Sequence, residues 1–143
     1  MSDSTPARLR ALVVGCGHMG ASHAQAYHNL KDDFEIVGLV ARGEGSRGKL
    51  NARLGGGLAE FSDYADALAH SQPDVVCIST YPDTHADYAM AALEAGAHVF
   101  LEKPLAVTVE EAETVIAKAR EKNRKLLVGY ILQVHPAWKR FAE

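Results

Sequence analysis

Short apolar runs recur along the chain, and polar, helix-forming stretches separate them. Residues 9–14 form an apolar run that stops at Gly15, and residues 34–40 form another that is rich in β-branched side chains. Such runs are typical of strands buried on both faces of a parallel sheet. The same pattern predicts further strands at 57–61, 74–80, 98–101 and 125–130.

Helices are expected between these strands, because the intervening stretches place apolar residues three or four positions apart. Residues 43–48 are polar and glycine-rich and are expected to form a loop. Ser62 is expected to cap one helix. Thr108 opens a capping-box pattern for another helix, whose apolar stripe would include Val109 and Ile116. The expected helices cover 21–30, 49–54, 62–70, 84–95 and 108–122, and one more could begin within 135–143.

This alternation of strands and helices predicts an α/β fold. Right-handed crossovers between successive parallel strands would give a doubly wound, mostly parallel sheet of about six strands, with helices on both faces, which is the Rossmann fold. Residues 1–8 are expected to form a flexible lead. In such sheets ligands bind beyond the carboxyl ends of the strands, so the residues that follow each strand are the candidates for function.

The turn after the first strand is the strongest single candidate. Gly15, Gly17 and Gly20 have the spacing of a dinucleotide-binding turn, with His18 and Met19 between them. The first glycine permits the tight turn, the second lets backbone approach a pyrophosphate, and the third lets the helix pack closely on the strand. The helix N-terminus would then face the phosphates. The alternative is a turn with a purely structural role.

The end of the second strand bears on the choice of cofactor. NAD-specific sites have an acidic residue about 20 positions past the glycines, to hold the ribose hydroxyls. Here Ala41 and Arg42 follow the strand, and no carboxylate occurs before Glu44. A guanidinium favours a ribose 2′-phosphate, so NADP is preferred over NAD, with Ser46 and Arg47 as helpers. Alternatively, Arg42 is solvated or stacks on adenine, and Glu44 restores NAD binding.

Glu102, Lys103 and Pro104 directly follow another predicted strand. A lysine at the carboxyl end of a strand points into the ligand crevice, where its ammonium can anchor a substrate hydroxyl or assist a proton transfer. The neighbouring carboxylate could orient it. The alternative is a surface ion pair worth about 0–1 kcal/mol.

Composition limits the remaining possibilities. The chain has 143 residues, 48% of them hydrophobic and 23% charged, which suits one soluble globular domain. Its net charge of −3 gives no reason to expect nucleic acid or a membrane surface as partner. We find no apolar stretch long enough to span a membrane and no signal peptide, and we expect Cys16 and Cys77 to be reduced residues of a cytoplasmic protein. No histidine or cysteine spacing indicates a metal site.

Three ordered motifs together resemble the Gfo/Idh/MocA family, the relatives of glucose–fructose oxidoreductase and inositol dehydrogenase. The motifs are residues 15–20, 80–85 and 95–106, and the similarity covers nearly the whole chain. The resemblance implies an NAD(P)-dependent dehydrogenase that transfers hydride to or from a polyol or a sugar-like alcohol. A non-catalytic NAD(P)-binding module is the alternative.

The resemblance also implies roles for individual residues. It places the pyrophosphate on the glycine turn. Lys103 would lie near nicotinamide and substrate and polarise or deprotonate the substrate hydroxyl, and Glu102 would touch the cofactor ribose. Asp83 stands where relatives commonly have asparagine, Gln133 where they often have arginine, and Ala41 where NAD-preferring members have an acid. The implied cofactor contacts outside residues 41–47 are Gly15, Gly17, His18, Met19, Gly20, Thr80, Tyr81, Pro82, Asp83, His85, Glu102 and Lys103.

Members of this family continue into a second α/β domain that carries substrate contacts and the oligomer interface. By this resemblance, residues 9–134 are the NAD(P)-binding domain, and residues 135–143 are the start of a missing or truncated second domain. Trp138 and Phe141 would pack against that part. Without it, we expect them to be exposed or to mediate self-association through residues 130–141.

Overall fold

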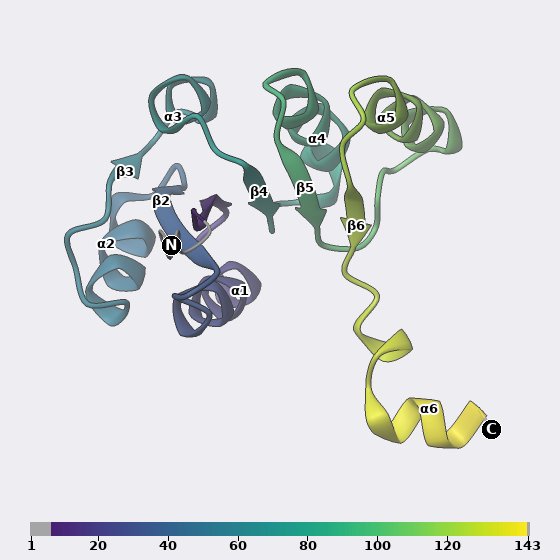
Figure 1. The fold of residues 1–143 in the computed structure, drawn as a ribbon, viewed down its shortest axis with the longest axis horizontal. Helices are drawn as coiled ribbons and strands as arrows, with labels where there is room; N and C mark the ends of the chain where they lie inside the picture. The colour runs from purple at the N-terminus through teal and green to yellow at the C-terminus, as the bar shows by residue number, and fades with distance from the viewer. Residues whose placement is uncertain (1–6, 143) are drawn as a thin grey trace, which may run out of the picture.

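The structure, a computed structural model, describes residues 7–142 and contains one six-stranded sheet (Figure 1). All strand pairs are parallel, and the order across the sheet is β3-β2-β1-β4-β5-β6. The strand order reverses between β1 and β4, so the predicted doubly wound sheet is confirmed. The strands are β1 Leu9–Val14, β2 Phe34–Val40, β3 Glu60–Phe61, β4 Val75–Ile78, β5 His98–Leu101 and β6 Leu126–Val128.

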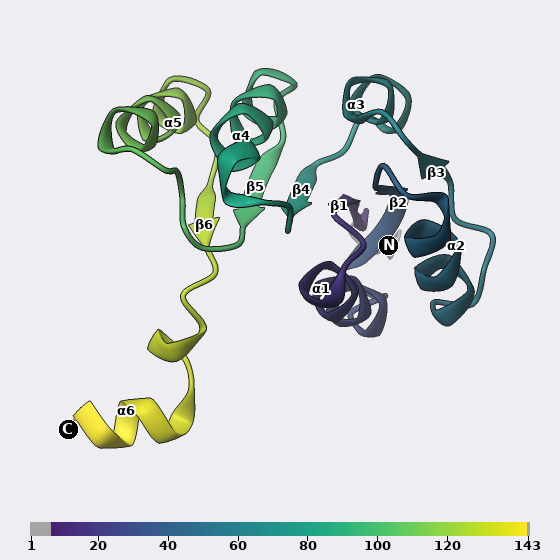
Figure 2. The same ribbon diagram turned by 180° about the vertical axis from the view of Figure 1, so that it is seen from behind.

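Helices cover both faces of the sheet, as predicted. Helices α1 and α2 lie on one face, and α3, α4 and α5 lie on the other (Figures 1 and 2). Two short 3-10 turns follow β4 and β6. The helices are α1 His18–Asn29, α2 Glu44–Arg53, α3 Tyr64–Ser71, α4 His85–Glu94, α5 Val109–Glu121 and α6 Pro136–Ala142, and the turns are η1 Pro82–Thr84 and η2 Ile131–Gln133.

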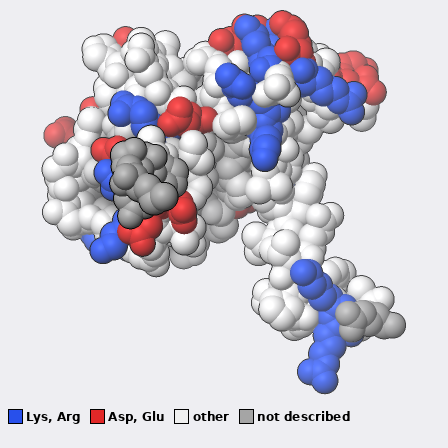
Figure 3. Space-filling view, in the orientation of Figure 1, with Lys and Arg blue, Asp and Glu red and all other residues white. Residues whose placement is uncertain are grey.

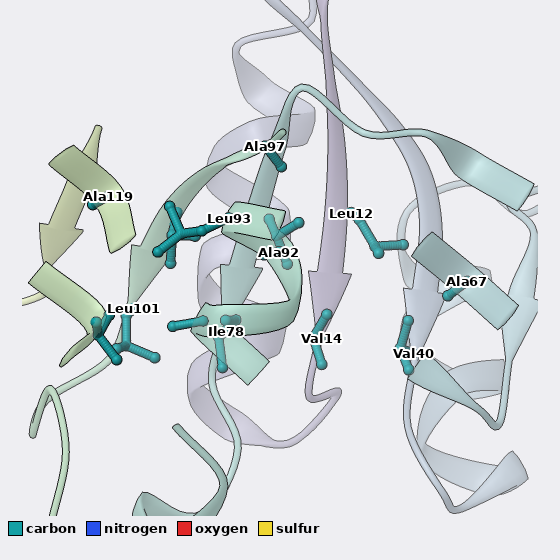
Figure 4. Packing of buried hydrophobic residues seen from close by; sticks show 14 residues of the cluster. Leu12, Val14, Val40, Ala67, Ile78, Ala92, Leu93, Ala97, Leu101 and Ala119 are labelled. Carbon is teal, nitrogen blue, oxygen red and sulfur yellow. The ribbon is translucent and has the colours of Figure 1, made fainter. Parts of the chain in front are cut away.

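The core consists of two layers because successive residues of a strand point to opposite faces of a sheet. Leu12 and Val14 of β1 pack under α3, α4 and α5, where Leu93 and Leu101 are also fully buried (Figure 4). Val13, between them, belongs to the smaller cluster under α1 and α2. The strands in the middle of the sheet are therefore buried on both sides, which explains why they read as nearly continuous apolar runs.

Three predicted helix starts were wrong. Helix α1 begins at His18, three residues before the predicted start, so the glycine turn runs directly into it. Helix α2 begins at Glu44, so most of the predicted loop 43–48 is helical. Each helical glycine costs about 1 kcal/mol relative to alanine, and burial of Leu50 and Leu54 against the sheet offsets that cost. Helix α3 is capped by Asp63, whose carboxylate accepts from the Asp66 N–H, and not by Ser62.

Helix α5 confirms its predicted cap and part of its predicted apolar stripe, which comprised Val109, Ala112, Ile116 and Ala119. The Thr108 hydroxyl accepts from the backbone N–H of Glu111 at 3.2 Å. Val115 and Ala119 are buried, whereas Val109 is 70% exposed and Ile116 is also exposed. The helix carries two neighbouring apolar stripes, and packing against α4 and the sheet selects one of them.

The C-terminal segment leaves the sheet after β6 and ends in α6, which lies apart from the other helices (Figure 1). A helix was predicted within 135–143, and α6 confirms it. Most of the predicted lead, residues 1–6, falls outside the described residues. Between residues 7 and 142, no helix has the length and apolar character needed to cross a membrane.

Candidate functional site

The glycine turn is shaped by close backbone contacts. Gly15 has φ +96°, a conformation that favours glycine, and its N–H donates to the Val40 carbonyl at 2.8 Å. A methyl group on Gly20 would overlap the carbonyl oxygen of Gly15, so helix α1 could not pack this closely on β1. A methyl group on Gly17 would meet no protein atom within 4 Å. Gly15 and Gly20 therefore shape the turn, while Gly17 leaves open space.

The open space lies at the N-terminus of α1. Gly17 is the N-cap residue, and its extended backbone carries no side chain that could cap the helix. The first turn of a helix leaves N–H groups without intrahelical partners, and its dipole is positive there. This end of α1 can therefore receive an anion such as a pyrophosphate.

A cleft of about 1310 Å³ runs along the carboxyl ends of the strands and includes this turn. Residues from the ends of β1, β2, β4 and β5 line it together with the segment after β6, as the doubly wound topology predicts. The predicted site residues that line the cleft are Gly15, Gly17, His18, Met19, Ala41, Arg42, Ser46, Thr80, Tyr81, Pro82, Asp83, Glu102 and Lys103, and Gln133 lines it as well.

Arg47 does not line this cleft. Its guanidinium is largely buried and donates to the carbonyl oxygens of Ala41 and Arg42, with Nε 3.6 Å from a carboxylate oxygen of Glu60. The side chain thus stabilises the connection between β2 and α2. Arg42 is exposed and lines the cleft, so the structure separates the two arginines that the sequence analysis grouped together.

His85 is also absent from the cleft lining. It is 1% exposed, and its Nδ1 and Nε2 lie 2.6 Å and 3.1 Å from the carbonyl oxygens of Pro104 and Thr80. Both ring nitrogens therefore face backbone oxygens. The residue holds the loop after β5 against the end of β4, and it influences the cleft through those two loops.

Glu102 and Lys103 line the cleft at the carboxyl end of β5, two strands along the sheet from the glycine turn of β1. Lys103 is exposed, whereas Glu102 is only 8% exposed. Glu102 Oε1 lies 2.7 Å from Nε2 of His23, a residue of α1 that was expected on the helix surface but is only 18% exposed. The sequence held one indication that His23 faces the sheet: it follows Gly20 by three positions, and residues so spaced share a helix face.

Two tyrosines, Tyr64 of α3 and Tyr88 of α4, also line the cleft and form an aromatic wall. The rings of Tyr64 and Tyr88 lie 4.6 Å apart, and the Tyr64 hydroxyl donates to the Tyr88 carbonyl at 2.8 Å. Burial raises the pKa of Tyr64, which keeps that hydroxyl protonated as a donor. Ser79, at the end of β4, also lines the cleft, and its buried hydroxyl has no hydrogen-bond partner within residues 7–142. The sequence analysis missed these residues, because only the folded chain brings α3 and α4 together.

A smaller cavity of about 550 Å³ opens between α1 and α2, beside the glycine turn. Its polar lining includes Ser46, Lys49 and Arg53, and its apolar lining includes Leu50 and Cys16. Burial raises the pKa of the Cys16 thiol to about 11, so it is a neutral wall residue. The cavity therefore combines an apolar floor with basic side chains.

No cluster of three or more histidine, cysteine or acidic residues in the described part of the chain is arranged to hold a metal ion. The chemistry that this site offers consists of exposed backbone N–H groups, the carboxylates of Asp83 and Glu102, the ammonium of Lys103, the guanidinium of Arg42 and several hydroxyl groups. Cys16 and Cys77 are buried, as predicted.

Known proteins are similar to this chain in both sequence and fold. The family described as "Oxidoreductase family, NAD-binding Rossmann fold" matches residues 9–130. UDP-N-acetylglucosamine 3-dehydrogenase of Acidithiobacillus ferrooxidans is 33% identical over 129 residues, which cover 90% of this chain and 39% of that protein. Inositol 2-dehydrogenase of Salmonella typhimurium is 34% identical over 120 residues, which cover 84% of this chain and 35% of that protein.

Solved structures of such proteins have the same fold. The Acidithiobacillus ferrooxidans UDP-N-acetylglucosamine 3-dehydrogenase superposes with a TM-score of 0.82 at 32% identity, covering 95% of this chain and 43% of that one. GenD2 from gentamicin A biosynthesis, solved in complex with NAD, gives 0.79 at 28% identity, covering 90% and 36%. The chain thus spans about two fifths of the length of the relatives that it matches.

Proposed function

The chain belongs to the oxidoreductase family with an NAD-binding Rossmann fold, and we propose that it is the cofactor-binding part of a dehydrogenase acting on a polyol or a sugar-like alcohol. One observation carries the proposal. A single cleft is lined by the glycine turn and the open N-terminus of α1, and by Glu102 and Lys103, which follow a strand two places along the sheet. An extended dinucleotide would place its phosphates at the glycine turn and its redox ring at Glu102 and Lys103.

The lining of the cleft fits each part of such a cofactor. The space beside Gly17 and the N-terminus of α1 suits the pyrophosphate. The wall of Tyr64 and Tyr88 beyond Arg42 suits a flat adenine base.

Lys103 is the residue proposed to act on the substrate. The cofactor would supply the hydride acceptor or donor when bound. The ammonium of Lys103 would donate a hydrogen bond to the substrate oxygen and polarise the carbon–oxygen bond at which hydride is transferred. Glu102, beside it, would hold a cofactor hydroxyl and so place the redox ring next to the substrate carbon.

We further propose NADP as the preferred dinucleotide, with NAD as the alternative. Arg42 reaches the cleft from the end of β2, and Ser46 lies where the cleft meets the smaller cavity. Lys49 and Arg53 line that cavity and add positive charge beside the expected 2′-phosphate. Glu60, the nearest acid on β3, faces Arg47. GenD2 was solved in complex with NAD, and this supports NAD as the alternative cofactor.

A competition between NADH and NADPH tests the cofactor. Protein fluorescence titrations should show tighter binding of NADPH, and the preference should fall about tenfold in Arg42→Ala, since one charge-assisted hydrogen bond is worth about 1.5–3 kcal/mol. Arg120→Ala, on the exposed face of α5, is the matched control and should bind both cofactors as the unaltered chain does. An unchanged preference in Arg42→Ala would contradict the NADP assignment.

A cofactor-binding module without turnover is the second candidate function. The chain spans about two fifths of its relatives, and Lys103 is the one lysine among the described residues that line the cleft. Oxidation of a panel of polyols and sugars, followed as NAD(P)H absorbance, decides between the two. Turnover that disappears in Lys103→Met but persists in Lys31→Met, an exposed control, supports the enzyme. Cofactor binding without turnover supports the module.

The segment after β6 is proposed to meet a partner surface. Trp138 and Phe141 stack at 5.6 Å and are 48% and 80% exposed, which is unusual for large apolar side chains. We propose that residues 135–142 begin the second domain of the whole protein, and that residues 130–141 allow self-association in the isolated chain. Sedimentation at increasing concentration, compared with Phe141→Ser, tests the second part. The buried free thiols of Cys16 and Cys77 support our expectation of a cytoplasmic protein.

A further inference from the structure

Helix α1 supplies a side chain to the part of the cleft at Glu102 and Lys103. His23 Nε2 lies 2.7 Å from Glu102 Oε1, although the two residues are 79 positions apart in the sequence. Their side chains are 18% and 10% exposed, so water screens the contact poorly. The imidazole also meets the ring of Phe100 edge-on, with the centroids 4.8 Å apart. These two contacts define the orientation of the histidine ring.

Glu102 is constrained on several sides but keeps one oxygen free. Its backbone N–H donates to the Ile78 carbonyl at 2.9 Å, which anchors the residue at the end of β5. A methyl group on Gly129 would lie 3.3 Å from Oε1, so the carboxylate occupies the space that this glycine leaves. A carboxylate only accepts hydrogen bonds when ionised, so Nε2 of His23 carries the proton of this contact. Oε2 has no hydrogen-bond partner among residues 7–142, and Glu102 lines the cleft.

We infer that His23 is a positioning residue for cofactor binding: it holds Oε1 of Glu102 so that Oε2 faces the cleft and accepts from a hydroxyl of the nicotinamide ribose. This inference rests on the proposed function. The donated hydrogen bond stops rotation of the carboxylate and compensates part of the cost of burying it. Because α1 also presents its N-terminus to the pyrophosphate, one helix sets both ends of the distance that the dinucleotide must span.

Two substitutions separate positioning from packing. His23→Leu removes the donor but keeps an apolar contact with Phe100, whereas His23→Gln can still donate from an amide nitrogen to Glu102. Binding of NADH should weaken about tenfold in His23→Leu, the cost of one hydrogen bond to a charged group, and recover in His23→Gln. Binding of ADP, which has the pyrophosphate but lacks the nicotinamide ribose, should stay unchanged in both variants.

Three further measurements complete the test. His28→Leu, on the exposed side of the same helix, is the control and should bind NADH normally. In a Glu102→Gln background, His23→Leu should have little additional effect, because the two residues act as one unit. Thermal unfolding of each variant shows whether the fold is retained.

Each other outcome has a distinct meaning. Equal weakening of NADH and ADP in His23→Leu would show that the histidine merely supports α1, and would overturn the inference. Normal NADH binding in His23→Leu would also overturn it, while the proposed function would stand. Failure of the unaltered chain to bind NADH or NADPH would overturn the proposed function and the inference together.

Discussion

The part of the cleft at the glycine turn (the glycine end) and the part at Glu102 and Lys103 (the lysine end) are held in shape by different kinds of contact. At the glycine end, the turn after β1 is shaped by backbone contacts, such as Gly15 N–H to the Val40 carbonyl, and by the absence of side chains at Gly17 and Gly20. At the lysine end, side-chain hydrogen bonds fix the geometry: His23 holds Glu102, and His85 holds the loops after β4 and β5. The glycine end therefore depends on close packing of backbone on backbone, and the lysine end depends on side-chain hydrogen bonds between distant segments.

This difference determines how each end should respond to substitution. A glycine turn tolerates no added atom where backbone packs on backbone, and the cost appears directly as lost stability. A framework of side-chain hydrogen bonds can lose one member and still fold, but its geometry loosens and ligand binding suffers. Stability and binding should therefore be linked at Gly20 and separable at the lysine end.

The largest effect is expected for Gly20→Ala. The added methyl group would overlap the Gly15 carbonyl oxygen, so α1 must move away from β1, at a cost of about 3 kcal/mol or more in the free energy of unfolding. Chemical denaturation measures this cost. Gly17→Ala is the matched control: it should change stability by less than about 0.5 kcal/mol, yet weaken NADH binding by blocking the phosphate site. Equal destabilisation by the two substitutions would contradict the distinction.

His85→Leu should have the next largest effect. It removes the contacts of both ring nitrogens and leaves the buried carbonyl oxygens of Thr80 and Pro104 without these partners, at a cost of about 2 kcal/mol in the free energy of unfolding. The loops at the lysine end should loosen, so NADH binding should weaken while ADP binding persists. Calorimetric titration with both ligands tests this. Loss of ADP binding to the same extent would show that the two ends are not independent.

Gly129→Ala is expected to act on the lysine end alone. The new methyl group would lie 3.3 Å from Glu102 Oε1 and 3.2 Å from a ring carbon of Phe100, so the carboxylate must shift by a few tenths of an ångström. We expect a cost of about 1 kcal/mol and NADH binding about fivefold weaker, with ADP binding unchanged. Fluorescence titration measures the binding, and Gly48→Ala, where no atom lies within 4 Å of the added methyl, serves as control.

The smallest effect concerns ties between helices far from the cleft. Glu94 of α4 binds Lys118 and Lys122 of α5 at 2.6 Å and 2.7 Å, where Figure 3 shows acidic and basic side chains gathered together. Hydrogen bonds from these lysines lower the pKa of Glu94 from its ordinary value of 4.5 to about 2. A carboxylate with a lowered pKa in the folded state stabilises the fold above pH 4.5, and this contribution is lost as the pH falls towards 2.

Glu94→Gln should therefore destabilise the fold slightly at pH 7, because exposed ion pairs contribute little, and this difference from the unaltered chain should disappear as the pH falls from 4.5 to 2. Urea denaturation at several pH values measures this. Cofactor binding should be unchanged, since Glu94 does not line the cleft. A pH dependence identical to that of the unaltered chain would contradict the assignment.

The strands in the middle of the sheet were predictable because parallel strands buried on both faces are apolar throughout. The glycine turn was predictable because its glycine spacing lies within six residues. Helix α2 was predicted to start too late, since its glycines indicate a loop until burial of Leu50 and Leu54 against the sheet is known.

Side-chain direction was the main source of error at the site. Arg47 carries a charge suited to a phosphate, but the fold turns it towards the carbonyl oxygens behind β2. His85 follows the η1 turn, close to the cleft in sequence, but it points into the protein. The wall of Tyr64 and Tyr88 was not predicted at all, because the two residues come from different helices.

By itself, the sequence determined the doubly wound sheet, the glycine turn after β1 and the lysine at the end of β5, because each follows from the order of neighbouring elements or from a pattern within one strand and its turn. The tertiary structure alone decided which charged and aromatic side chains reach the cleft, and it alone brought His23 to Glu102. The physical reason is distance along the chain: a contact between residues 79 positions apart depends on how whole helices and strands pack, which no local pattern records.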